Sequence, residues 1–477
     1  MLFNSFEYWV FLPIVFLLYW FVFCKTASHQ NLLLLAASYF FYGWWSWKFL
    51  VLLAVSTLLD FGYGFGVASA IKNRSRFFLW MSIINNLGIL AVFKYYDFFI
   101  TQFQHGLRIL DVHISPSLIQ VALPIGISFY TFHGMSYVFD IYRGLRKPVA
   151  NLADYALFVS FFPLLISGPI ERANHLLPQV QAKRSFSYTQ AVDGGRLILW
   201  GMFKKVVIAD SLALYVNEIF DRYPSHHSLT LILGAVGFSF QIYADFSGYT
   251  DIATGTAKLF GFELLSNFKF PYFSRNLAEF WRRWHISLTT WFRDYLYIPM
   301  GGSKQGKRLA VRNTFIVFLI SGFWHGASWN FIVWGGIHAC GFMPLLLSSR
   351  NRKHTGKIVA ADRLLPSARE LLQMLGTFTF VTISWIFFRL HGVRSGVDYV
   401  KGIFSSFDDP GEALRFLGIL YYVIPLILID WWLRRDERKI RWVSSPAIGW
   451  TIYIIVLTII FAYMGNAQAY RFIYFQF

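Results

Sequence analysis

The chain is built from long, uninterrupted blocks of apolar residues separated by short polar segments. Each block approaches the ~20 residues that a helix needs to cross the hydrocarbon core of a bilayer. The blocks are continuous rather than alternating between apolar and polar positions, so they predict spanning helices and not the strands of a closed barrel. The predicted segments are residues 8–24, 30–47, 50–69, 77–100, 118–141, 155–170, 192–220, 229–248, 311–328, 329–348, 371–390, 416–433 and 446–464.

The segment at 155–170 is the weakest of these predictions. It is short and contains Pro163 and Pro169, which indicates a re-entrant segment. We therefore expect eleven to thirteen membrane segments. The sequence shows no internal repeat and no part suited to a separate soluble domain, so we expect one membrane-embedded domain over residues 1–477. Its core motifs lie at 123–348, and a C-terminal tail lies at 472–477.

Composition supports an all-α polytopic membrane protein. Of the 477 residues, 56% are hydrophobic and 14% are charged, against roughly a quarter charged in soluble domains. The N-terminal stretch lacks a basic region and a small-residue cleavage site, which indicates a retained first span rather than a cleaved signal peptide. Cys24 and Cys340 both lie in apolar stretches, so we expect neither a disulfide framework nor a cysteine-based metal site.

The net charge of +18 comes from short basic loops and predicts orientation, not nucleic-acid binding. By the positive-inside rule the richest loops face the cytosol, which places both termini outside. A basic cytosolic face would also help to recruit an anionic donor. The four richest loops are residues 72–76, 143–147, 350–357 and 434–441.

Residues 249–310 differ from the rest, because aromatic and basic residues alternate there at helical spacing. This pattern predicts an amphipathic helix along the membrane interface, with tryptophans on one face and arginines on another. The glycine-rich turn that follows, "PMGGSKQGKR", lacks the spacing of a phosphate-binding loop. The aromatic and aliphatic positions are Trp281, Trp284, Leu288, Trp291 and Tyr295, and the charged ones are Arg275, Arg282, Arg283, Arg293 and Asp294.

Ionisable residues inside or beside apolar blocks are candidates for function, because burying them in a membrane is costly. His325 stands out, since Gly322, Gly326 and Ala327 around it would let a backbone or a substrate approach closely. His338, on the following segment, is more typical of a helix-packing or orienting group. The candidates are His133, Asp245, Asp251, His285, His325 and His338.

The residue types favour general-base chemistry over the alternatives. The histidines are scattered and have no cysteine or carboxylate at metal-ligand spacing, so we expect no metal. No serine lies in a Gly-x-Ser-x-Gly turn of the kind that activates a nucleophile. A buried imidazole stays neutral and can accept a proton at pH 7, which suits deprotonating a hydroxyl that attacks an activated acyl group.

Five long motifs, in this order, make the chain resemble the membrane-bound O-acyltransferases. Within that family it is most similar to the bacterial alginate O-acetylation branch, and more distantly to the teichoic-acid D-alanyl transfer branch. The similarity extends over nearly the whole chain. The motifs are "LPIGISFYTFHGMSYVFDIYRG" (123–144), "FFPLLISGPIER" (161–172), "QIYADFSGYTDIATGTAKLFGF" (241–262), "FWRRWHISLTTWFRDYLYIPMGGS" (280–303) and "SGFWHGASWNFIVWGGIHA" (321–339).

This resemblance implies roles for two histidines. His325 matches the family's catalytic histidine, and His285 matches a second histidine thought to line the same tunnel. Both are therefore the catalytic candidates, and Asp245, Tyr243, Asn330 and His338 are candidates for lining or supporting that tunnel. The resemblance also implies a funnel-shaped fold in which a cytosolic acyl thioester meets an acceptor that arrives from outside.

The last residues, "RFIYFQF", fit an F-x-Y-x-x-F pattern proposed in this branch to present a tyrosine as acyl acceptor. In this sequence that residue is Tyr474. A phenol, with a pKa of about 10, is a better leaving group than a sugar alkoxide, so a tyrosyl ester would stay activated for onward transfer. The alternative is that these terminal aromatics form part of an interfacial belt.

Taken together, the sequence predicts an O-acyltransferase of the bacterial inner membrane that feeds acetyl groups to an exported polysaccharide such as alginate. The expected donor is a cytosolic thioester, acetyl-CoA or an acylated carrier protein, with no bound cofactor. The expected partners are membrane lipids and a periplasmic acetyltransferase, and no nucleic acid. Transfer of D-alanyl or another acyl group to a cell-envelope polymer, a transporter and a non-catalytic scaffold remain alternatives; a transporter would more often show two related halves.

Overall fold

The computed structural model describes residues 1–112, 123–166, 168–356, 358–405, 410–437, 446–466 and 473. Within these ranges the regular secondary structure is helical, and no strand is present. Each of the thirteen predicted segments overlaps a helical part of the chain. The prediction of an all-helical, multi-pass membrane protein is confirmed.

Eight of the thirteen predicted segments are apolar helices of the kind expected in a bilayer. Six are long enough to cross it, and two are shorter. The other five predicted segments overlap α2 (Ala27–Gly43), α6 (Ile127–Tyr142), α7 and α8 (Leu152–Ser160 and Phe162–Leu165), α10 and α11 (Tyr188–Met202 and Asp210–Asp221) and α15 (Lys307–His325). The six are Trp47–Val67 (α3), Lys72–Ile109 (α4 to α5), Ser228–Leu259 (α12), Trp329–Leu347 (α16), Ala368–Arg389 (α17) and Ala447–Met464 (in α21). The shorter two are Phe6–Val22 and Gly418–Leu433.

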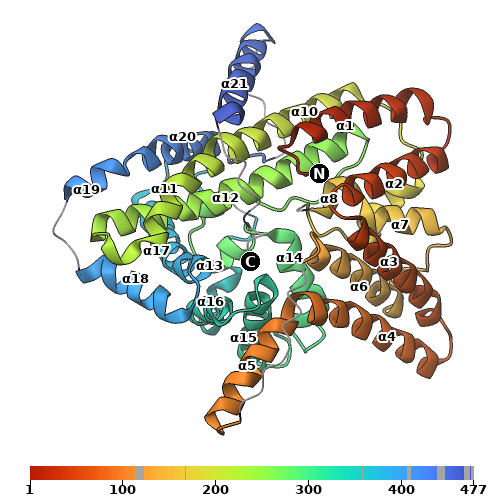
Figure 1. Cartoon of the computed structure of the whole chain (residues 1–477), viewed down its shortest axis with the longest axis horizontal. Helices are drawn as coiled ribbons and strands as arrows, with labels where there is room; N and C mark the ends of the chain where they lie inside the picture. The colour runs from red at the N-terminus through yellow and green to blue at the C-terminus, as the bar shows by residue number, and fades with distance from the viewer. Residues whose placement is uncertain are drawn as a thin grey trace. The chain divides into compact units, whose positions relative to one another are not determined.

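The chain divides into two compact units, and the first comprises Met1–Val192 with Thr256–Leu265. It contains the N-terminal helices, which Figure 1 draws in red to yellow. Its helices are α1 (Phe6–Leu17), η1 (Leu18–Val22), α2 (Ala27–Gly43), α3 (Trp47–Val67), α4 (Lys72–Leu90), η2 (Ala91–Tyr95), α5 (Tyr96–Ile109), α6 (Ile127–Tyr142), α7 (Leu152–Ser160), α8 (Phe162–Leu165) and α9 (Ala173–Gln181).

Helices α3, α4 and α6 pack together (Figure 1). A buried carboxylate, Asp60, lies among them. Asp60 on α3 accepts hydrogen bonds from Ser82 (2.7 Å) and Asn86 (3.0 Å) on α4. Gly134 on α6 lies against the Asp60 carboxylate, where any Cβ would clash. The polar residues of these apolar helices therefore satisfy one another, as a low-dielectric interior requires.

The segment predicted to be re-entrant is a broken helix. Helix α7 ends at Ser160, Phe161 leaves the helical conformation, and the four-residue α8 follows with Pro163 in its first turn. Pro163 has no N–H to donate and is tolerated there because the first turn needs none.

The second unit comprises Asp193–Gly255 and Ser266–Phe477. We expect one domain over residues 1–477. The division into two compact units does not test that expectation, which stays a prediction. The helices that begin in or enter this unit are α10 (Tyr188–Met202), η3 (Phe203–Ala209), α11 (Asp210–Asp221), η4 (Tyr223–Ser225), α12 (Ser228–Leu259), η5 (Pro271–Phe273), α13 (Leu277–Trp281), α14 (Ile286–Phe292), η6 (Arg293–Tyr297), α15 (Lys307–His325), α16 (Trp329–Leu347), η7 (Arg350–Arg352), α17 (Ala368–Arg389), α18 (Val393–Ser405), α19 (Pro410–Arg415), α20 (Gly418–Leu433) and α21 (Pro446–Asn466).

Arg184 holds several segments of the first unit together. Its guanidinium donates to the Tyr19 hydroxyl (2.8 Å), the Asn31 side chain (2.6 Å) and the Val180 carbonyl (2.7 Å), and it lies over the Phe262 ring at 4.9 Å. A planar fork of five donors can reach these partners at once, and a lysine ammonium cannot.

We predict that Arg184→Lys lowers the free energy of unfolding by about 2–3 kcal/mol, because at least two hydrogen bonds to a charged group are lost. Thermal unfolding in detergent micelles measures this as a lower midpoint. Arg394→Lys is the matched control, since that side chain is 95% exposed on α18. Equal midpoints for the two variants would contradict the role given to Arg184.

Candidate functional site

His325 is the last residue of α15 and is buried among aromatic rings. It is 4% exposed. Its ring meets those of Trp324 (5.0 Å between centroids), Trp334 (5.2 Å) and Phe388 (5.3 Å), each in an edge-to-face arrangement. The His325 ring is therefore enclosed by aromatic side chains from α15, α16 and α17.

His285 lies in the tight turn between α13 and α14 and is equally buried. Its backbone adopts the left-handed conformation, with φ of 41°. Its Nδ1 lies 3.0 Å from the Asn267 side-chain oxygen, which also accepts from the hydroxyl of Ser287 (3.0 Å). Because an amide oxygen only accepts, Nδ1 of His285 carries the proton, and Nε2 is the acceptor nitrogen.

One tryptophan links the two histidines. The Trp324 ring lies 6.1 Å from the His285 ring and 5.0 Å from the His325 ring, between centroids. The structure therefore brings together two residues that lie forty positions apart in the sequence. Both are buried in the same aromatic cluster of the second unit.

The prediction of an amphipathic interfacial helix over residues 275–295 is wrong. The segment breaks at Arg282–His285, and its tryptophans are buried: Trp281 is 8% exposed, Trp284 1% and Trp291 6%. The physical reason lies outside the segment, where the Asn267 carbonyl accepts the Ile286 N–H (2.9 Å) and the Lys269 N–H bonds back to Arg283 (3.0 Å). These contacts turn the chain inward, so the aromatic periodicity reflects burial rather than an interface.

A buried carboxylate on α13, the helix that precedes this turn, stabilises the turn. Glu279 accepts hydrogen bonds from both guanidinium groups beside it, Arg275 (3.0 Å) and Arg283 (2.8 Å), and from the Arg275 N–H (2.9 Å). Burial alone would raise the pKa of this carboxyl, but these bonds outweigh it and hold the pKa below its usual 4.5. Glu279 is thus ionised and fixed at neutral pH.

The glycines beside His325 let neighbouring parts of the protein pack closely. Gly322 lies against the backbone carbonyl of Phe331, and Gly326 lies against the Phe331 ring, so a Cβ at either position would clash. Gly335 on α16 meets the Phe318 backbone in the same way. Of the two expected alternatives, a close backbone or a close substrate, the structure shows the first at Gly322 and Gly326: they let α15 and α16 approach closely.

His338 and Asn330 make contacts that favour a supporting role. His338 Nε2 lies 2.9 Å from the Ser384 hydroxyl, which donates its own proton to the Val381 carbonyl (2.7 Å). Nε2 of His338 is thus the donor in this pair. Asn330 donates to the Phe387 carbonyl (3.2 Å) and bonds the Ser328 hydroxyl, which ties the turn after His325 to the end of α17.

Helix α12 contributes the predicted Tyr243 and Asp245 beside the His285 turn. Tyr243 donates to Asp430 on α20 (2.7 Å), and Asp245 pairs with Lys205 (2.8 Å). The Phe246 ring, next to Asp245, lies edge-to-face on His285 at 4.7 Å. Tyr474 lies outside the described residues.

The two remaining candidates, His133 and Asp251, form a hydrogen bond and an ion pair with other protein groups. His133 lies in the first unit, where its Nε2 accepts the Glu171 N–H (3.1 Å). Asp251 forms an ion pair with Lys204 (2.6 Å). In the part of the chain that the structure describes, no three histidine, cysteine or acidic residues are grouped so as to hold a metal ion.

Sequence reasoning missed three residues that organise the site. Lys204 and Lys205 are ionisable residues inside the predicted segment 192–220, so the criterion applied to the histidines would have found them. Asn267 carries no comparable signal, since an asparagine after a helix is ordinary, and only the fold brings it to His285.

A cavity of about 470 Å³ lies between α14 and the pair α15–α16. Its walls include Ile286, next to His285, and Ser321, one helical turn before His325. Its lining is mostly apolar but includes three arginines, Arg282, Arg293 and Arg352. The cavity therefore combines an apolar wall, formed in part by the segments that carry the histidines, with arginines of the kind that bind phosphate groups.

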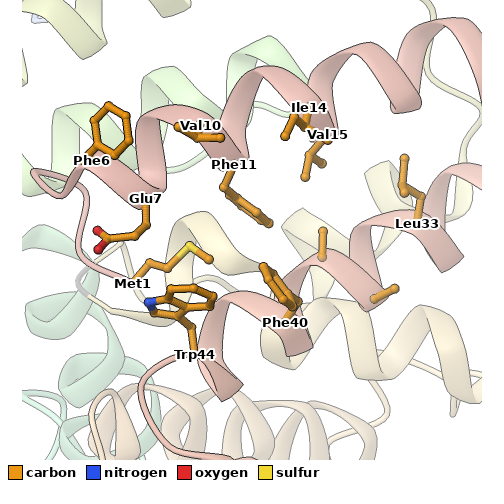
Figure 2. A pocket seen from close by; sticks show the side chains of 12 residues that line it. Met1, Phe6, Glu7, Val10, Phe11, Ile14, Val15, Leu33, Phe40 and Trp44 are labelled. Atoms are coloured by element: carbon orange, nitrogen blue, oxygen red, sulfur yellow. The ribbon is translucent and has the colours of Figure 1, made fainter.

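A second cavity, of about 620 Å³, belongs to the first unit and lacks such chemistry. Figure 2 shows it between α1 and α2, where Phe11 and Phe40 stack at 6.1 Å and aliphatic side chains complete the wall. Glu7 is the one acidic residue among its twelve lining residues, and no histidine lines it. It suits a hydrocarbon chain rather than a reaction.

The His285 turn should lose stability in acid. Burial lowers the pKa of His285 to about 3, against 6.5 for an exposed imidazole, so unfolding takes up a proton at any pH between these values. The stabilisation from Glu279 is present above pH 4.5 and is lost as pH falls below it. We predict that the free energy of unfolding falls by about 1 kcal/mol per pH unit below pH 6.5.

Thermal midpoints in detergent between pH 7.5 and pH 4 measure this loss. His285→Asn should remove the part of the decline that begins near pH 6.5, whereas His105→Asn, at an exposed position on α5, should leave it in place. A decline of unchanged slope in His285→Asn would contradict the assignment.

Comparison with known proteins gives this site its context. The chain matches the family model described as MBOAT, membrane-bound O-acyltransferase family, over residues 145–386, which include His285, His325 and His338. It is 34% identical to "Probable alginate O-acetylase AlgI" of Pseudomonas putida, covering 98% of this chain and 98% of the relative.

Two further relatives differ in the polymer that their names give. The chain is 32% identical to the peptidoglycan O-acetyltransferase of Helicobacter pylori, over 98% of this chain and 95% of the relative. It is 31% identical to the teichoic acid D-alanyltransferase of Bacillus subtilis, over 55% of this chain and 68% of the relative. The chain therefore belongs to the membrane-bound O-acyltransferase family, and it is an O-acyltransferase.

Proposed function

We propose that this O-acyltransferase moves an acetyl group from a cytosolic thioester across the bacterial inner membrane, for O-acetylation of an exported polysaccharide such as alginate. In this proposal both termini face the outside, and the basic loops, among them residues 350–357, face the cytosol. The donor is acetyl-CoA or an acetylated carrier protein, which share a phosphate-bearing arm that ends in a thiol.

The acetyl assignment is supported by the extent of similarity. Two relatives named for O-acetylation, from Pseudomonas putida and Helicobacter pylori, match over 98% of this chain. The relative named for D-alanyl transfer matches over 55% of it. D-alanyl or other acyl transfer to a cell-envelope polymer is thus the second candidate, with the same chemistry and a different acyl group.

The observation that carries the proposal is the pair of buried histidines. His325 and His285 lie in one aromatic cluster, joined by Trp324, with His285 held in a defined tautomer by Asn267. A buried histidine pair of this kind can handle a proton where water is excluded.

The proposed reaction assigns one role to each histidine. His325 takes the proton of the acceptor hydroxyl, and the oxygen attacks the carbonyl carbon of the thioester. The tetrahedral intermediate collapses, the carbon–sulfur bond breaks, and the leaving thiolate takes the proton back from His325. The products are an O-acetyl ester and a free thiol. His285 helps to position the acceptor or the thioester; its acceptor nitrogen, Nε2, suits the hydroxyl of the acceptor, because a thioester group has no proton to donate.

The 470 Å³ cavity is the proposed route for the donor. It borders both histidine-bearing segments, and its apolar wall suits the pantetheine arm. Arg352 belongs to the basic loop assigned to the cytosol, so the arginine-lined part of the cavity would face the compartment that holds the donor. Arginine binds the phosphate groups that both candidate donors carry.

On the outer side, we propose that Tyr474 accepts the acetyl group first and passes it to a periplasmic acetyltransferase. A tyrosyl ester remains activated because the phenol is a good leaving group, with a pKa of about 10. The C-terminal F-x-Y-x-x-F pattern supports this assignment.

We predict that His325→Ala lowers polysaccharide O-acetylation in cells by about 10²- to 10⁴-fold, the usual effect of losing a general base. His105→Ala, at an exposed position on α5, should retain full acetylation at equal membrane abundance. Full acetylation by inserted His325→Ala would show the base assignment to be wrong. Tyr474→Phe in the same assay tests the relay alone, because its retention of activity would leave the histidine assignment intact.

The donor route predicts a different kinetic effect. Arg352→Gln and Arg293→Gln should each raise the KM for the thioester donor about tenfold and leave kcat nearly unchanged, since they remove binding that is equal in the ground and transition states. Purified protein with acetyl-CoA and a soluble acceptor measures both constants, and Arg394→Gln on α18 is the control. An unchanged KM in both cavity variants would exclude this route.

A further inference from the structure

Ile473, the one residue after Asn466 that the structure describes, makes a specific contact inside the second unit. The backbone N–H of Ile473 donates to Oδ2 of Asp245, at 2.7 Å. Both residues are buried, at 3% exposure each. A backbone donor at a buried carboxylate is a charge-assisted hydrogen bond, stronger than one between neutral groups.

The acceptor is one member of a buried ion cluster. Oδ1 of Asp245 pairs with the Lys205 ammonium (2.8 Å), which also pairs with Asp210 (2.7 Å) and lies over the Tyr249 ring at 5.5 Å. Lys205 lies on η3, a π-helical turn, and turns of this kind are frequent at functional sites. Charged groups in membrane helices are expensive, so a cluster of this kind needs a function or complete pairing.

Ile473 adds a backbone donor to this cluster. The Lys205 ammonium contacts two carboxylates, Asp210 and Asp245. The N–H of Ile473 places the positive end of a peptide dipole on the second of them, at Oδ2, whereas Lys205 pairs with Oδ1. Because the donor is a backbone N–H, any residue other than proline at position 473 can make this hydrogen bond.

The position of this contact connects it with the candidate active site. Phe246, the next residue on α12, has its ring 4.7 Å from that of His285. The carboxylate that holds Ile473 therefore lies on the same turn of α12 that packs against His285. In the sequence, Ile473 immediately precedes Tyr474.

We propose that Asp245, held by Lys205, is a positioning residue that docks the C-terminal segment beside the His285 turn through the N–H of Ile473. The docking of Ile473 on Asp245 does not depend on the proposed acyl-transfer reaction. Its consequence for catalysis rests on the proposed function, in which the tail supplies the acyl acceptor.

The docking is tested on the intact protein by the rate at which carboxypeptidase removes C-terminal residues, followed by mass spectrometry. Ile473→Pro removes the donated proton and leaves the ion cluster in place, whereas Ile473→Val keeps it. We expect trimming to quicken about tenfold in Ile473→Pro, as expected from loss of a hydrogen bond to a charged group, and to stay unchanged in Ile473→Val.

A second pair of variants tests the acceptor. Asp245→Ala should quicken trimming as Ile473→Pro does, whereas Asp251→Asn, on the same helix and paired with Lys204, should not. Trimming of Ile473→Pro at the rate of the unchanged chain would overturn the proposal, and so would equally fast trimming in both control variants. Fast trimming in Ile473→Pro alone upholds the contact even where Asp245→Ala fails to fold.

Measuring acyl transfer in the same four variants separates two hypotheses: that Asp245 docks Ile473, and that the tail takes part in acyl transfer. If docking and transfer fall together, Asp245 positions the tail for the reaction. If trimming quickens while transfer from acetyl-CoA is unchanged, the docking stands, and the role of the tail in acyl transfer is wrong.

Discussion

The site depends on one constraint: an imidazole or a charge inside an apolar helical protein must be partnered by another part of the chain. Water is excluded there, and an unpartnered polar group costs more than most packing contacts gain. In the second unit this requirement joins segments that are distant in the sequence. Asn267 fixes His285, Ser384 fixes His338, and Asp430 fixes Tyr243. The partners that reduce the free-energy cost of burying these side chains also fix the orientation of each ring and the tautomer of the two histidines.

The same constraint explains why the two principal histidines differ. His285 lies in a left-handed turn whose geometry is set by the Asn267 loop and braced by Glu279 with its two arginines. His325 ends a long helix and is surrounded by rings, with α16 drawn close by Gly322. The first is a rigidly placed acceptor of hydrogen bonds, and the second is an imidazole in an aromatic pocket. The proposed roles, a positioning group for His285 and a base for His325, rest on this difference.

Much of the fold could be predicted from the sequence, because apolar blocks of bilayer length have few alternatives to helices. Eight of thirteen segments are apolar helices of the described chain, and His285, His325 and His338 fall into one cluster. The break at Arg282–His285 could not be predicted, because it depends on contacts with residues 267–269 rather than on local propensity. The sequence also left open whether a backbone or a substrate approaches Gly322 and Gly326, since only the packed structure shows that Phe331 lies against both. At the break, tertiary contacts overrode the local pattern.

The central claim is that His325 activates the acceptor for attack on the thioester, and a single-turnover experiment tests it most directly. Purified protein in nanodiscs is mixed with isotopically labelled acetyl-CoA in the absence of polymer. Thiol release and label on the C-terminal peptide are then followed by mass spectrometry. The account predicts thiol release with label on the peptide containing Tyr474 in the unchanged chain, and a rate at least about a hundredfold lower in correctly inserted His325→Ala. Labelling of that peptide at an equal rate in His325→Ala would contradict the account.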